Sequence, residues 1–196
     1  MDEDFLNIDE GAVLLRIARD SLYDWVRSGE RAALDGYELT PHLRERHGAF
    51  VTLRRGGGLR GCIGYTHSKV SLAEAVRDNA INAGTGDPRF PPVTTDELPD
   101  LRIEVSALCP GDSPGSPFRR VEDIGALELG ADGLYLELGD TGRGGLLLPQ
   151  VPIEQGWELD AYLDAICRKS GATPDAWRDP ANTLYRFRAQ VFSETA

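Results

Sequence analysis

Hydrophobic residues recur every three or four positions in three segments of the chain, which is the spacing of amphipathic helices. The predicted helices cover residues 9–28, 71–84 and 158–169. In the first, Asp9 is the expected N-cap, and Ile8 and Val13 are expected to form a hydrophobic staple. In the second, Ser71 and Glu74 fit the S-x-x-E capping box that begins many helices.

Strict alternation of apolar and polar residues predicts strands elsewhere. It is clearest in residues 101–109, where Glu104 and Ser106 share the polar side. The glycines at 56–58 predict a hairpin between strands 49–55 and 59–65. Further strands are expected at 127–129, 134–138, 145–148 and 184–192, with residues 36–48 irregular. Strands without regular βαβ order favour a mainly antiparallel α+β fold, with an internal boundary expected in the Pro/Gly/Ser segment 110–117.

The charge of the chain narrows the classes of function. Lys and Arg total 21 and Asp and Glu total 32 among 196 residues, so the formal net charge is 21 − 32 = −11. This argues against a nucleic-acid binder, which needs a cationic surface to displace counterions from phosphates. Cys62, Cys109 and Cys167 are too few and too widely spaced for a disulfide framework. With neither a signal-peptide pattern nor an apolar spanning run, we expect a soluble cytoplasmic protein.

Familiar cofactor motifs are missing from the sequence. The glycine-rich segments GGGLRG and GDTGRGG lack the Lys and Ser/Thr of a phosphate-binding loop. His42, His47 and His67 form no metal-ligand spacing with each other or with the cysteines. The sequence therefore indicates no bound metal or cofactor.

The segment LRGCIG at residues 59–64 is the first candidate for chemistry. In a regular strand Arg60 and Cys62 share one face, and a guanidinium beside a thiol favours the reactive thiolate. Gly61 and Gly64 would let a ligand or another backbone approach closely. The alternative is that Cys62 is a buried structural residue and that the glycines serve the hairpin.

Three other segments offer polar groups. Glu104 and Ser106 could act as an acid or base with its orienting partner, or could simply face solvent. In the loop GDPRFPPV, Arg89 could bind an anionic ligand, or Asp87 and Arg89 could form a structural network. Gln150 could supply an amide to a site or satisfy a loop carbonyl.

LRGCIG resembles the hallmark of the AMMECR family, named after the AMME chromosomal region of a human syndrome. Other segments follow in the family's order: DPRFPPV (87–93), IEVSAL (103–108), DGLYLE (132–137), LLLPQVPIEQGW (146–157) and CRKSG (167–171). The resemblance covers residues 10–193 and is strongest to archaeal members. It implies one domain of two interlocked parts: a larger antiparallel sheet flanked by helices, and a smaller part packed against it. It also implies that the shared motifs converge near the cleft between the two parts.

The resemblance gathers the candidates into one hypothesis. Cys62 would be a nucleophile or carrier thiol, Arg60 would favour its thiolate, and Glu104 would act as acid, base or orienting carboxylate. The expected substrate-binding residues are Gly61, Gly64, Asp87, Arg89, Ser106 and Gln150. The family also implies association with a Memo-like protein and a radical-SAM enzyme. The competing hypothesis is a non-catalytic adaptor that binds a partner protein or small ligand in the same groove.

Overall fold

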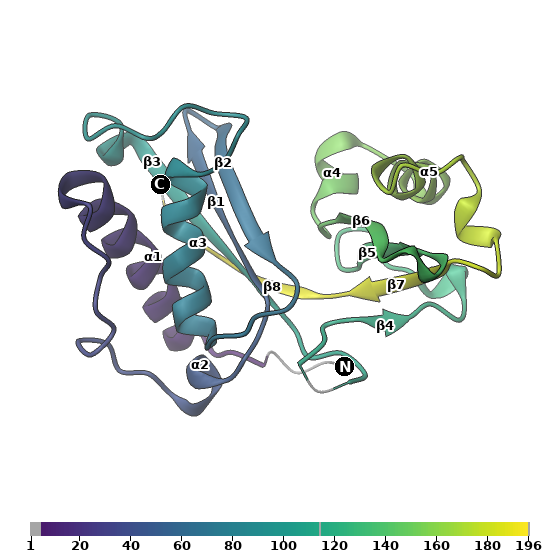
Figure 1. Ribbon diagram of the computed structural model, residues 1–196, viewed down its shortest axis with the longest axis horizontal. Helices are drawn as coiled ribbons and strands as arrows, with labels where there is room; N and C mark the ends of the chain where they lie inside the picture. The colour runs from purple at the N-terminus through teal and green to yellow at the C-terminus, as the bar shows by residue number, and fades with distance from the viewer. Residues whose placement is uncertain (1–4, 114, 196) are drawn as a thin grey trace. The chain divides into compact units, whose positions relative to one another are not determined.

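The computed structural model describes residues 5–113 and 115–195. The chain divides into two compact units, one formed by Met1–Leu108 with Gln190–Ala196 and the other by Cys109–Ala189. Each unit has its own four-stranded sheet and its own helices, and the strand pairs of known register are antiparallel (Figure 1). The prediction of a mainly antiparallel α+β fold is therefore confirmed. The second unit begins at Cys109, one residue before segment 110–117, in which residue 114 lies outside the described residues.

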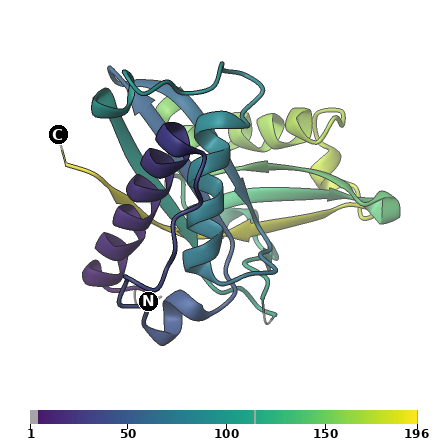
Figure 2. The same ribbon diagram turned by 60° about the vertical axis from the view of Figure 1, so that its left-hand side comes forward.

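In the first unit two helices cover one face of the sheet. The elements are α1 (Ile8–Ser28), α2 (Pro41–Arg44), β1 (Ala49–Arg55), β2 (Gly58–Tyr65), α3 (Leu72–Thr85), the 3-10 helix η1 (Leu98–Asp100), β3 (Leu101–Leu108) and β8 (Ala189–Ser193). The strand order is β2-β1-β3-β8. α1 and α3 lie side by side on the sheet in both ribbon views (Figures 1 and 2). Leu14 and Val76 pack with Val51, Leu53 and Ile103 in one core, so the opposite face of the sheet carries the alternate residues.

α1 begins one residue earlier than predicted, at Ile8. Its N-cap is Asn7, whose side chain accepts a hydrogen bond from the N–H of Glu10, while the Glu10 carboxylate accepts one from the N–H of Asn7. The expected cap at Asp9 is wrong, and Ile8 is a helical residue that is 81% exposed, so it forms no staple with Val13. Among the described residues, no helix has both the length and the apolar character needed to cross a membrane.

α3 begins at the predicted capping box of Ser71 and Glu74. Near its other end it touches β2 backbone to backbone. A Cβ on Gly61 would stand 2.1 Å from the carbonyl oxygen of Ala83. Gly61 therefore faces the helix, and the backbone that approaches it closely is that of α3.

The two chain ends of the first unit are bound to the rest of that unit. The side-chain amide of Gln190 accepts a hydrogen bond from the N–H of Leu6 at 2.8 Å and donates one to its carbonyl at 3.0 Å. Glu194 forms an ion pair with Arg19 of α1 and accepts a hydrogen bond from the N–H of Ile103 at 2.9 Å. β8 is thereby attached to α1, to β3 and to the segment before α1.

The second unit has the strand order β4-β7-β5-β6. Its elements are β4 (Arg119–Arg120), η2 (Ile124–Ala126), β5 (Gly133–Leu138), η3 (Gly139–Thr141), β6 (Arg143–Leu147), α4 (Val151–Gln155), α5 (Leu159–Lys169), η4 (Ala176–Arg178) and β7 (Thr183–Phe187). Leu163 and Ile166 of α5 share a core with Leu134, Leu136 and Leu184 of the sheet. This unit therefore also buries one face of its sheet under a helix.

Three predictions of secondary structure are wrong. Residues 127–129 are not a strand but follow the short helix η2. Residues 184–192 are not one strand, because the chain leaves β7 in one sheet and enters β8 in the other. The segment 36–48, expected to be irregular, contains α2. Helices of one turn are too short to show a period, and alternation continues across a change of sheet.

Replacing Gly61 by Ala is expected to destabilise the protein by roughly 2–3 kcal/mol, because the new methyl group meets rigid backbone of α3. The measurement is urea unfolding followed by far-UV circular dichroism. Gly58→Ala is the matched control in the same strand, since its nearest neighbour would lie 3.6 Å from the new Cβ. Equal stability of the two variants would contradict the assigned contact.

Candidate functional site

Polar residues form a row across three strands on the sheet face opposite the helices. Thr52 of β1 stands directly opposite Cys62 of β2 and opposite Glu104 of β3. The hydroxyl of Ser193 in β8 donates to a Glu104 carboxylate oxygen at 3.4 Å. The predicted residues Cys62 and Glu104 therefore share one face of one sheet, with Thr52 between them.

The Cys62 thiol is held mostly out of water. Thr52 Oγ1 donates a hydrogen bond to Cys62 Sγ at 3.3 Å. Burial raises the pKa of the thiol above its ordinary value, the Thr52 hydrogen bond and the charge of Arg89 oppose that shift, and Asp87 and Glu104 add to it. This shift opposes the activated thiolate that the sequence analysis expects, because burial disfavours the charged form of the thiol.

The backbone of Cys62 is clamped from the loop that follows α3. Asp87 accepts a hydrogen bond from the Cys62 N–H at 2.9 Å, and Arg89 Nη2 donates to the Cys62 carbonyl at 3.2 Å. β2 is the edge strand of its sheet, so these outward-pointing groups have no neighbouring strand to bond. The loop takes the place of that strand and orients the residue that carries the thiol.

Asp87 and Arg89 also bind each other. Two Asp87 oxygens accept from Arg89 Nε at 2.9 Å and Nη2 at 2.7 Å. This pairing holds the pKa of Asp87 well below its usual range. Asp87 is buried, whereas the Arg89 side chain is 53% exposed. The guanidinium is thus fixed in position yet still open to solvent beside Cys62.

Arg60 forms an ion pair with Glu97. Arg60 Nε and Nη2 donate to the two Glu97 oxygens at 2.9 and 3.0 Å. Arg60 also lies at a bulge in the hairpin: Arg54 pairs with Leu59 but Leu53 pairs with Gly61, so Arg60 has no partner in β1. The effect of Arg60 on the Cys62 thiolate stays a prediction, while Arg89 is a guanidinium whose charge lowers the pKa of the thiol.

The next row of residues on the same sheet face has an aromatic side chain, Phe50, at its central strand β1. Phe50 stands opposite Gly64 on one side and Ser106 on the other. A Cβ on Gly64 would lie 2.4 Å from the Phe50 ring, so the missing side chain makes room for that ring. The Ser106 hydroxyl is buried and has no hydrogen-bond partner among the described residues.

Gln150 belongs to the second unit, where it precedes α4. Its Oε1 atom is buried without a hydrogen-bond partner in the described part of the chain. Its membership of the Cys62 site stays a prediction. Within residues 5–113 and 115–195, no group of three or more His, Cys, Asp or Glu side chains is arranged to hold a metal ion.

Two residues of this region are absent from the sequence-based hypothesis. The sequence gives no signal for Glu97, because the motif LRGCIG places its partner Arg60 beside the Cys62 thiol. Thr52 could be found only through the hairpin register. Continuing the register of Arg55 with Gly58 would place Gly61 opposite Thr52, and the bulge at Arg60 moves Cys62 there instead. The register shift, which single-sequence alternation does not reveal, decides the composition of the row.

Comparison with known proteins gives consistent matches along almost the whole chain. The model of the AMMECR1 family matches residues 15–192. A protein of Methanothermobacter thermautotrophicus is 42% identical over 189 residues, covering 96% of both chains. A protein of Thermococcus gammatolerans is 43% identical over 190 residues, covering 94% of this chain and 90% of its own. The crystal structure of the uncharacterized protein PH0010 from Pyrococcus horikoshii has a TM-score of 0.86 at 36% identity and covers 96% of this chain and 93% of its own, which supports the fold.

Acid is expected to weaken the protein partly through Glu97. Hydrogen bonds from Arg60 lower the pKa of Glu97 to about 2, below the ~4.3 of an unfolded Glu. Its contribution, about 2–3 kcal/mol, is therefore complete above the unfolded value and is lost as pH falls from about 5 to 2. Chemical unfolding at several pH values should show wild type and Glu97→Gln converging in stability toward pH 2.

The control is Glu38→Gln, which removes an exposed carboxylate. Its difference from wild type should stay small and independent of pH. A Glu97→Gln variant whose deficit did not shrink in acid would mean that the ion pair with Arg60 contributes nothing through its charge.

Proposed function

Since the chain belongs to the AMMECR1 family, we propose a function for the segment that carries the family's LRGCIG motif: it binds a small ligand at Cys62 and processes it through the thiol. The observation that carries the proposal is the row of Cys62, Thr52 and Glu104 on one sheet face. A thiol, a hydroxyl that donates to it, and a carboxylate are the groups that covalent thiol chemistry needs.

Each of these groups has a separate part in the proposed reaction. Cys62 Sγ attacks an electrophilic carbon of the ligand, and Glu104 takes the thiol proton and returns it to the leaving group. Thr52 keeps a donor on the sulfur, which favours the anion as it forms. Because burial keeps the thiol protonated at rest, the nucleophile appears only when a ligand is present.

Arg89 is proposed to bind an anionic group of the ligand. Asp87 fixes the guanidinium through its Nε and Nη2 atoms, and the side chain remains half-exposed. Holding a charged donor in place before the ligand arrives reduces the ordering cost of binding.

A second candidate function is a non-catalytic binding module. It is favoured by the burial that raises the pKa of the Cys62 thiol and by the ion pairs of the nearby arginines, since Arg60 is bonded to Glu97 and Arg89 to Asp87. In this case Cys62 is a packing residue, and the polar row contacts a partner protein. The Memo-like protein and the radical-SAM enzyme are the proposed partners under either function.

Alkylation of Cys62 in a Cys109→Ser, Cys167→Ala background is expected to show an apparent pKa above the ~8.5 of a free thiol. Thr52→Val should raise the pKa further, because the sulfur loses a donor that stabilises the anion. Arg89→Gln should reduce the rate ratio of iodoacetate to iodoacetamide, and Glu104→Gln should increase it. Stopped-flow alkylation against pH gives both the pKa and the ratio.

The same series decides between the two functions. A thiol that reacts in the folded protein, with a charge preference set by Arg89 and Glu104, supports a ligand-processing site. If Cys62 reacts only after urea unfolds the chain, the thiol reaction is excluded and the binding module remains.

Partner binding should separate the two roles independently. If the site processes a ligand, Glu104→Trp should leave binding of the purified Memo-like and radical-SAM proteins within about twofold of wild type. If the row is a binding surface, the same variant should abolish the complex, because the enlarged side chain blocks it. Surface plasmon resonance gives the affinities, with Glu122→Trp on an exposed position of the second unit as the control.

A further inference from the structure

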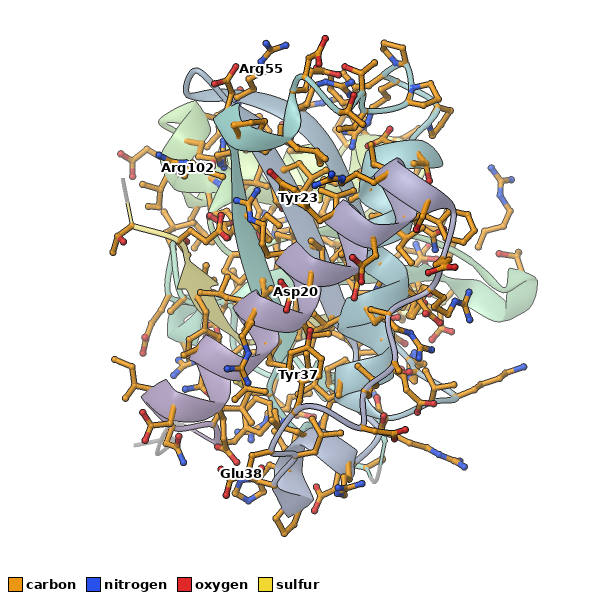
Figure 3. All side chains as sticks on the ribbon, turned by 90° about the vertical axis from the view of Figure 1, so that its left-hand side faces the viewer. Asp20, Tyr23, Tyr37, Glu38, Arg55 and Arg102 are labelled. Carbon is orange, nitrogen blue, oxygen red and sulfur yellow. The ribbon has the colours of Figure 1, made fainter. Side chains whose placement is uncertain are left out.

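The first unit has a hollow away from the Cys62 row, between the segment that precedes α2 and the first half of α3. It has a volume of about 690 Å³, within the range of small-molecule sites. Leu34, Leu39 and the ring of Tyr37 supply its apolar wall. Tyr37 is fixed there, since its hydroxyl donates to Asp20 of α1 at 2.6 Å, and Figure 3 shows both residues on the side of the unit covered by α1.

The polar wall comes from one face of α3. Glu74 and Arg77 are three residues apart, which makes them neighbours on the helix surface. They do not bond each other. Among the described residues, both hydrogen bonds to the Glu74 carboxylate come from Ser71 and reach Oε2, and the Arg77 side chain donates one hydrogen bond, from Nε to Asp78 at 2.9 Å.

Each of the two side chains therefore keeps binding capacity toward the hollow. Glu74 Oε1 and the terminal nitrogens of Arg77 have no hydrogen-bond partner among the described residues. The Arg77 side chain is only 15% exposed and lines the hollow, so its position is restricted by the residues around it. Hydrogen bonds from Ser71 lower the pKa of Glu74, which keeps it ionised.

The residues that line the hollow carry equal numbers of positive and negative charges. Asp35 and Arg44 at the exposed rim add one further charge of each sign to those of Glu74 and Arg77. A ligand with a single charge would satisfy one half of this arrangement and be repelled by the other. A molecule with an ammonium and a carboxylate a few ångströms apart satisfies both, and the apolar wall accommodates a hydrocarbon side chain.

We propose that this hollow is a binding site for a free α-amino acid with an apolar side chain, with its ammonium on Glu74, its carboxylate on Arg77 and its side chain against Leu34, Leu39 and Tyr37. The site is independent of the reaction proposed at Cys62. A peptide terminus carries only one of the two charged groups, so it is excluded by the same geometry.

The test is titration of the full chain with L-leucine, followed by backbone amide NMR. Saturable shifts are expected in residues 33–44 and 71–77. N-acetyl-L-leucine, which lacks the ammonium, and L-leucinamide, which lacks the carboxylate, should each bind at least about tenfold more weakly, as expected for the loss of one charge-assisted contact. These two analogues also represent the ends of a peptide.

Three variants probe the site itself. Glu74→Gln removes the charge but keeps a residue that can complete the capping box. Arg77→Met removes the guanidinium. Each variant should lower the affinity for L-leucine by at least about tenfold. Ala33→Trp at the exposed rim should fill the hollow without disturbing the core. Glu122→Gln and Arg120→Met, both exposed in the second unit, are the matched controls and should bind as wild type does.

The proposal is overturned if wild-type protein shows no saturable response to L-leucine up to about 10 mM, a weak limit for a specific site. It is also overturned if N-acetyl-L-leucine binds as well as L-leucine, which would make the hollow a simple anion site. Thermal unfolding of each variant identifies any loss of binding that comes from loss of folding.

Discussion

The contact between Gly61 and the carbonyl of Ala83 determines how α3 lies on β2. No side chain can be placed between them, so the last turns of the helix rest directly on the edge strand. The chain leaves α3 beside that strand, and the loop after it therefore reaches the outer edge of Cys62 with Asp87 and Arg89. A few residues later Glu97 meets Arg60. One close backbone approach thus positions the groups around the candidate site.

The two arginines near Cys62 have different carboxylate partners and different exposure. Arg60 is committed to Glu97 through both of its bonded nitrogens, and it fixes the start of β2 against the segment before β3. Arg89 is committed to Asp87 but remains half-exposed next to the thiol. The thiol itself lies between a positive guanidinium and two carboxylates, and their opposing charges leave burial as the dominant influence on its protonation. A buried neutral thiol reacts slowly with solvent oxidants, because the thiolate is the reactive form.

Much of the fold could be predicted from the sequence, since periodicity located all of the longer helices and the β1–β2 hairpin. The capping box at Ser71 could also be predicted, because its two residues lie three positions apart in the sequence. The missed features depend on distant or subtle geometry. The bulge at Arg60 changes which residue faces Thr52, and no local pattern marks it. The passage from β7 to β8 preserves alternation while changing sheets. The same limit applies to the site: its residue types could be named from the motifs, but their pairings required the register.

The strand β8 has a consequence for how the protein is made. It completes the first unit beside β3 and is attached there through Gln190 and Glu194. In chain order, however, it follows the whole of the second unit. During synthesis the second unit is therefore complete before the first, although most of the first emerges from the ribosome earlier. Until β8 arrives, β3 has an unpaired edge, the kind of surface that recruits other strands. The nascent chain thus depends on a segment made after the second unit to close the sheet that carries Cys62.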